Sequence, residues 1–156
     1  MKTASLNDIK KELAKHNSAD LLEYCLRLAK FKKENKELLG YLLFESEDIA
    51  TYTKEIKNEI EEQFLQMNKS NIYFIKKTLR KILRNVNKQI RISMSRQVEA
   101  ELLIQFSNCI IKYSIPIKKS RQLTNLYQNQ MKKIDKSLAS LHPDLQYDLK
   151  RQLITA

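Results

Sequence analysis

Hydrophobic residues recur along almost the whole chain with the three- and four-residue spacing of an amphipathic helix. Between Glu47 and Met67, for example, apolar side chains stand at positions 49, 52, 56, 60, 64 and 67. The segment from Glu37 to Glu45 is apolar enough to resemble a strand, but its helical neighbours and flanking charges favour a helix. We therefore expect eight helices, with approximate ranges 5–16, 18–31, 37–45, 47–67, 71–91, 95–113, 120–141 and 143–153.

Capping and breaking residues support these boundaries. Ser5 and Ser18 are good N-cap residues for the first two helices. Pro116 ends the sixth helix because proline disfavours helix in the residue before it. Pro143 suits the first position of the last helix. The polar run 32–35 reads as a connection or a helix end, and 68–70 as a break.

Composition narrows the fold class further. The 156 residues include one glycine, Gly40, and two prolines. Hairpin turns and phosphate-binding loops need positive φ angles, which glycine supplies most cheaply, so hairpin-rich and Rossmann-type folds are disfavoured. We expect a single all-α domain over residues 1–156, either an irregular multi-helix bundle or a short solenoid-like stack. Gly40, inside an apolar helix, predicts a close contact between helices.

Charge is distributed unevenly along the chain. Residues 1–66 carry 11 Lys and Arg against 13 Asp and Glu, whereas residues 67–156 carry 18 against 5. The second part is therefore strongly basic, and the whole chain has a formal net charge of +11. A field of one sign attracts partners of the other sign, so we expect an anionic partner, a nucleic acid or an acidic protein.

The fifth helix carries the sharpest chemical signal. At about 100° per residue, its apolar positions occupy one arc and its cations another. No acidic residue occurs from 63 to 98. The candidate anion-binding residues are Tyr73, Lys76, Lys77, Arg80, Lys81, Arg84, Lys88 and Arg91.

Aromatic and basic side chains adjacent on one face can stack on bases and hold phosphates together. Tyr73 projects into the basic arc, and Phe74 lies at its edge. Three other interpretations stay open. Tyr73 could belong to the core, the acidic fourth helix (Glu55, Glu59, Glu61, Glu62) could neutralise the cations, and the face could meet a membrane surface. Two further clusters extend the basic surface if packing allows, at 118, 119 and 121 and at 132, 133 and 136.

Signals for chemistry are weak by comparison. His16 and His142 stand at helix ends, where histidine usually has a structural role, and no HExxH, GxSxG or Walker motif occurs. Cys25 and Cys109 form no CxxC pair and read as buried free thiols of a cytoplasmic protein. The N-terminus lacks the apolar region of a signal peptide, and the apolar run 38–44 is too short to span a bilayer. We expect no enzyme activity, metal, cofactor or membrane partner.

Three stretches, 25–45, 76–93 and 126–149, together resemble a family of small, all-helical bacterial proteins without assigned activity. The resemblance covers most of the chain and implies an all-helical fold and a cytoplasmic location. The resemblance implies no site residues in this chain.

The residues favour a non-enzymatic binding or scaffold module that presents its basic helix to an anionic macromolecule. The alternative is a protein–protein adaptor or homo-oligomeric structural protein that uses the apolar third helix, with Leu38, Leu39, Tyr41, Leu42, Leu43 and Phe44 as an exposed groove or dimer face. An enzyme with a pocket between helices is a third hypothesis.

Overall fold

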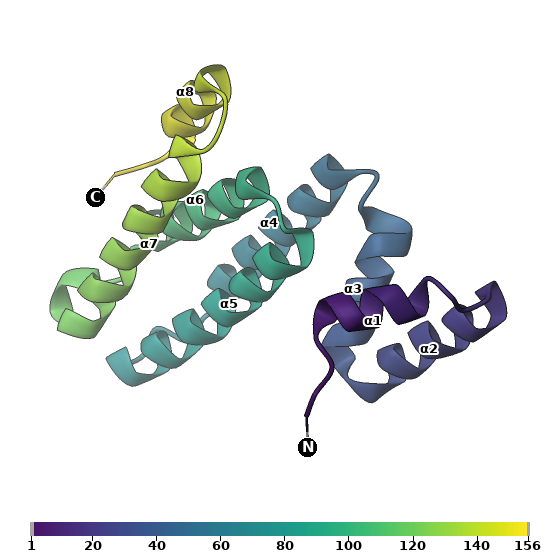
Figure 1. Cartoon of the computed structure of the whole chain (residues 1–156). Coiled ribbons are helices and arrows are strands. Elements are labelled where there is room, and N and C mark those ends of the chain that lie inside the picture. The colour runs from purple at the N-terminus through teal and green to yellow at the C-terminus, as the bar shows by residue number, and fades with distance from the viewer. Residues whose placement is uncertain (1, 156) are drawn as a thin grey trace. The chain divides into compact units, whose positions relative to one another are not determined.

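The computed structural model describes residues 2–155, and within this range the chain is all-α, without strands (Figure 1). The predicted fold class is therefore confirmed. By its internal contacts the chain divides into two compact units, Met1–Phe44 and Glu45–Ala156, called the N-terminal and C-terminal units below. A compact unit need not fold independently, so a single domain over residues 1–156 stays a prediction.

Three α-helices and a π-helical turn form the N-terminal unit. Their bounds are α1 (Leu6–Leu13), α2 (Ser18–Phe31), α3 (Lys33–Gly40) and η1 (Tyr41–Glu45), whose last residue opens the next unit. Ser5 caps α1 as predicted, through a reciprocal pair of hydrogen bonds with Asp8. The cap of α2 is Asn17 instead of the predicted Ser18, and its Oδ1 accepts from the Asp20 amide at 2.9 Å. The connection between α2 and α3, expected over 32–35, is the extended residue Lys32 alone.

The N-terminal unit buries little of its apolar surface. Tyr41, 5% exposed, is its one buried residue among those described. Leu22, Leu26 and Leu28, which the helical pattern predicts to face inward, are exposed, and so is Cys25, so the prediction that both thiols are buried is wrong for Cys25. Three short helices offer too few neighbours to cover an apolar face.

Gly40 does not serve the close helix contact that the sequence predicts. A Cβ atom built on Gly40 would meet no atom within 4 Å. The prediction of a close helix contact at Gly40 is therefore wrong, because the space beside this residue is open.

The C-terminal unit is a helical bundle arranged around α6. Figure 1 shows α6 between α7 on one side and the α4–α5 pair on the other, and α6 contacts α4, α5, α7 and α8. The bounds are α4 (Ile49–Leu65), α5 (Ile72–Ser93), α6 (Arg96–Lys112), η2 (Ile117–Lys119), α7 (Arg121–Ala139) and α8 (Pro143–Gln152).

Aromatic and aliphatic side chains fill the core of this bundle. Phe64 and Phe106 are fully buried and meet edge to face, with ring centroids 5.6 Å apart. Tyr113 stacks on Phe64, with ring centroids 6.0 Å apart. Burial of each such side chain contributes about 1.5–3 kcal/mol, so this cluster is a main source of stability.

Left-handed residues follow two helices of this unit, and a proline begins another. Met94, with φ of 50°, closes α5, and Ser114, with φ of 54°, follows α6. Pro143 occupies the start of α8 as predicted, and the Nδ1 of His142 accepts from the Asp144 amide at 3.2 Å. His142 is thus an N-cap residue. Among the described residues, no helix has both the length and the hydropathy to cross a bilayer.

Candidate nucleic-acid interface on helix α5

Helix α5 is an amphipathic helix with both of its ends defined by local geometry. Asn71 caps its N-terminus by accepting from the Phe74 amide at 3.0 Å, and left-handed Met94 ends it. The apolar face is buried as the sequence predicts, at Ile75, Leu79, Ile82 and Val86. Because this face packs into the bundle, the opposite arc with the cations is directed away from the core.

The N-terminal half of that basic arc lines a groove of about 620 Å³. Helix α7 supplies the other wall through Gln122, whose Oε1 accepts from Arg80 Nη2 at 3.4 Å. We call this hollow the α5 groove. Its lining residues are Ile72, Tyr73, Lys76, Lys77, Arg80, Arg84 and Gln122.

Within the described residues, the four cations of the α5 groove have no carboxylate oxygen within 4.0 Å. Lys76 is half-buried, whereas Lys77, Arg80 and Arg84 are exposed. Like-charge neighbours four residues apart, such as Arg80 and Arg84, each cost a few tenths of a kcal/mol. A groove that concentrates unpaired positive charge is a favourable position for an anion.

Tyr73 is a surface residue of this groove. Its side chain is 68% exposed and meets the Phe74 ring edge to face, with centroids 5.6 Å apart. The interpretation of Tyr73 as a core residue is therefore wrong. An exposed ring beside cations is a surface on which an unpaired base can stack.

Three of the candidate residues lie outside the α5 groove. Lys81 and Arg91 are exposed but do not line it. Lys88 is half-buried and faces Glu59 of α4. Burial, followed by the charge of Glu55, raises the pKa of Glu59, and Lys88 opposes this shift in part. The charge of the acidic helix therefore reaches Lys88, whereas within residues 2–155 the groove cations have no carboxylate oxygen within 4.0 Å.

Glu61, another acid of α4, belongs to a polar cluster with α6 instead. It forms an ion pair with Lys112 and accepts from Tyr113 Oη at 2.5 Å and from Gln105 Nε2 at 3.0 Å. The hydrogen bonds from Lys112 and Tyr113, in that order, lower the pKa of Glu61 to about 2.

The thiol of Cys109 also donates to Glu61, at 3.3 Å. Burial, together with this carboxylate, raises the pKa of Cys109 to about 12. A protonated buried thiol is a poor nucleophile, so the cluster ties α4 to α6 and offers no reactive group. The sequence alone does not indicate this cluster, because Cys109 and Tyr113 fall on an apolar stripe of the helix. The visible signal is the spacing of 105, 109 and 112, which puts three polar or thiol groups on one helix face.

The predicted extensions of the basic surface are exposed. Lys118 and Lys119 lie in η2, immediately before α7, and Arg121 opens α7 beside Gln122. The later lysines of α7 are exposed as well, at 132, 133 and 136. None of these six lines the α5 groove, so they add to the field around it.

Elsewhere the described residues contain no group of three or more His, Cys, Asp or Glu side chains that could hold a metal ion. His16 lies against Tyr24, whose hydroxyl is 3.1 Å from its Nδ1. Comparison with known proteins found no matching family model, no matching curated protein and no matching solved structure. The resemblance to small helical bacterial proteins stays a prediction.

Proposed function

We propose that the protein is a non-enzymatic binding module whose α5 groove holds single-stranded nucleic acid. Lys76, Lys77, Arg80 and Arg84 bind successive phosphates, and Tyr73 stacks on a base. The observation that carries the proposal is that four cations, none paired with a carboxylate in the described part of the chain, line the same groove as an exposed tyrosine.

The exposed ring favours a single strand over a duplex. Bases within a duplex already stack on one another, whereas unpaired bases gain about 1–3 kcal/mol each by stacking on an aromatic side chain. The groove also has few groups that could read a base edge. Gln122 is its one amide, and Arg80 already donates to that amide's oxygen. We therefore expect binding with little sequence preference.

The test is fluorescence anisotropy with labelled 12-nucleotide RNA and DNA, single-stranded and duplex, titrated over salt concentration. If four cations neutralise phosphates of a single strand, log K falls against log salt with a slope of about −2.8. The double substitution Arg80→Glu/Arg84→Glu should weaken binding at least ten-fold. Its matched control is Lys150→Glu/Arg151→Glu, which makes the same change of net charge on exposed residues of α8.

Stacking is tested separately from charge. Tyr73→Ala should weaken binding of a single strand by about ten-fold, the lower range of one base stack. Tyr147→Ala is the control, because Tyr147 is similarly exposed, at 64%, and also has an arginine, Arg151, near its ring.

Two results would overturn the proposal. One is equal weakening by the α5 and α8 charge reversals, since the groove would then be irrelevant. The other is tighter binding of poly-glutamate than of RNA together with no effect of Tyr73→Ala. That result would assign the α5 groove to an acidic protein.

A further inference from the structure

The N-terminal unit exposes more large apolar side chains than a stable surface normally carries. Phe31 and Phe44 are 78% and 83% exposed. Single exposed apolar residues are ordinary, but contiguous apolar patches mark interaction sites. The other exposed members of this set are Leu6, Ile9, Leu13, Leu22, Tyr24, Leu26, Leu28, Leu38, Leu42 and Leu43.

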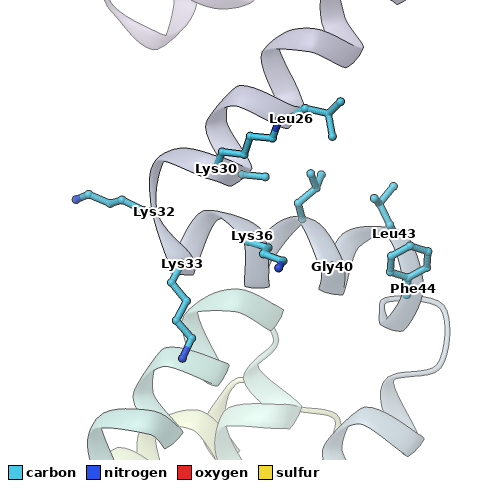
Figure 2. A pocket seen from close by; sticks show the side chains of 10 residues that line it. Leu26, Lys30, Lys32, Lys33, Lys36, Gly40, Leu43 and Phe44 are labelled. Atoms are coloured by element: carbon cyan, nitrogen blue, oxygen red, sulfur yellow. The ribbon is translucent and has the colours of Figure 1, made fainter.

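Part of this apolar surface forms a groove of about 660 Å³ between α2 and the α3–η1 segment (Figure 2). We call it the N-terminal groove. Figure 2 shows Leu26, Leu43 and Phe44 at the end away from the α2–α3 turn. Ala29 and Leu39 continue the apolar lining, and Gly40 leaves its floor open because it has no side chain.

Four lysines also line the N-terminal groove, and Figure 2 shows Lys32 and Lys33 at the α2–α3 turn. Lys30 comes from α2, Lys32 from the turn, and Lys33 and Lys36 from α3. Only Lys33 has an acidic partner, Glu37 Oε1 at 3.9 Å, whereas the other three have no carboxylate oxygen within 4.0 Å among the described residues. The lining thus combines apolar side chains with positive charge, and two of the lysines stand at the α2–α3 turn, away from Leu43 and Phe44.

We propose that the N-terminal groove binds an acidic amphipathic helix of a protein partner. Leu26, Leu43 and Phe44 take up the apolar face of that helix, and the unpaired lysines contact its carboxylates. Helix-in-groove recognition uses apolar anchors about one helical turn apart, and complementary charge fixes the direction of the bound helix.

Charge and shape distinguish this occupant from the other candidates. A second copy docked face to face would bring the same lysines together, and each chain already carries +11. A bilayer surface is flat, whereas this hollow has walls from two helices and accommodates a rod. The inference is independent of nucleic-acid binding, because no residue lines both the N-terminal and the α5 grooves.

The probe for the test is a fluorescein-labelled 18-residue peptide of leucine and glutamate, with leucine at i, i+3, i+4 and i+7. A peptide of the same composition with scrambled order has no apolar face and should bind at least ten-fold more weakly to the full chain. Leu43→Ser/Phe44→Ser should also weaken binding at least ten-fold. Leu65→Ser is the matched control, because Leu65 is an exposed leucine of α4 outside the groove.

A charge-reversed pair tests the lysines. Lys32→Glu/Lys36→Glu should weaken binding at least ten-fold and remove most of its salt dependence, whereas Lys10→Glu/Lys11→Glu on α1 should not. All these side chains are exposed, so the variants should keep the circular dichroism spectrum and melting temperature of the parent chain. Arg80→Glu/Arg84→Glu should leave peptide binding unchanged, which separates this test from that of nucleic-acid binding.

Three outcomes would overturn the proposal. The scrambled peptide could bind as tightly as the amphipathic one. Sedimentation could show a dimer that Leu43→Ser/Phe44→Ser dissociates, which would make a second copy the occupant. Finally, neutral phosphatidylcholine vesicles could bind the chain and compete with the peptide, which would assign the face to a bilayer.

Discussion

The two units of this chain place similar apolar side chains in opposite environments. Phe64 and Phe106 of the C-terminal unit are fully buried, while Phe31 and Phe44 of the N-terminal unit are largely exposed. Both units are helical and both have amphipathic helices. The difference is the number of neighbours, because α6 contacts four other helices whereas α2 packs mainly on α3. Helical sequence patterns are therefore no guarantee of a core, which needs enough helices to enclose it.

The same contrast separates the two proposed binding surfaces. The α5 groove is built on a helix whose other face is held by a packed core. The N-terminal groove is itself the uncovered apolar surface. We expect the first to bind as a preformed site and the second to become more ordered when a partner covers it.

Truncation of aromatic side chains should show the largest difference between the units. Phe106→Ala removes a fully buried ring and should lower the free energy of unfolding by about 3–5 kcal/mol. Phe44→Ala removes a ring that is already in solvent and should change the free energy of unfolding by less than about 0.5 kcal/mol. Urea denaturation followed by circular dichroism measures both. A comparable loss for Phe44→Ala would show that the exposed surface is covered in solution.

Hydrogen exchange should resolve the same contrast helix by helix. Amides in the middle of α6 should open only with global unfolding, whereas those of α1 and α2 should exchange through local opening. The difference in protection should be on the order of a hundred-fold or more. Exchange monitored by mass spectrometry measures it, and the acidic amphipathic peptide should slow exchange only in α2, α3 and η1, which line the N-terminal groove. Equal protection of α2 and α6 would contradict the comparison.

Glu61 gives the C-terminal unit a stabilising interaction that depends on pH. Its pKa in the folded protein, about 2, lies below the ordinary glutamate value of 4.5. The carboxylate therefore stabilises the fold above about pH 4.5, and this contribution is lost as the pH falls toward 2.

Glu61→Gln should accordingly lower the free energy of unfolding at pH 7 by about 1–2 kcal/mol. This loss is smaller than the full pKa difference implies, because solvent screens the partly exposed side chain. The loss should be smaller at pH 3. Glu55→Gln, at an exposed position of α4, is the control and should have little effect. A pH-independent loss for Glu61→Gln would indicate that packing, not charge, is responsible.

Two backbone substitutions should have the smallest effects. Met94 is exposed and left-handed, so Met94→Gly should raise the free energy of unfolding by about 0.5–1 kcal/mol. Gly40 ends α3 with open space around it, so Gly40→Ala should raise local helix stability by up to about 1 kcal/mol. Thermal melts measure the first, and exchange rates in α3 measure the second. Destabilisation by Gly40→Ala would show that the glycine is required for close packing.

The sequence by itself determined the helices and the chemistry of α5. Periodicity, caps and Pro143 predicted most helix ends to within a few residues of their positions in the structure, because these signals are local. The 100° rotation per residue also predicted that Ile75, Leu79, Ile82 and Val86 face inward and that Arg80 and Arg84 face outward. No knowledge of neighbouring helices was needed for either result.

Only the tertiary structure decided which faces have partners. It buried α6 on more than one side, since Ala100 and Ile104 are buried as well as Val98, Leu102 and Phe106. It left most of the apolar residues of α2 exposed, although they also follow a helical pattern. It also joined Arg80 to Gln122 and Glu61 to Lys112 across more than 40 residues of chain. The physical reason is that burial and pairing depend on helices brought together from distant parts of the chain, whereas helical periodicity depends only on residues a few positions apart.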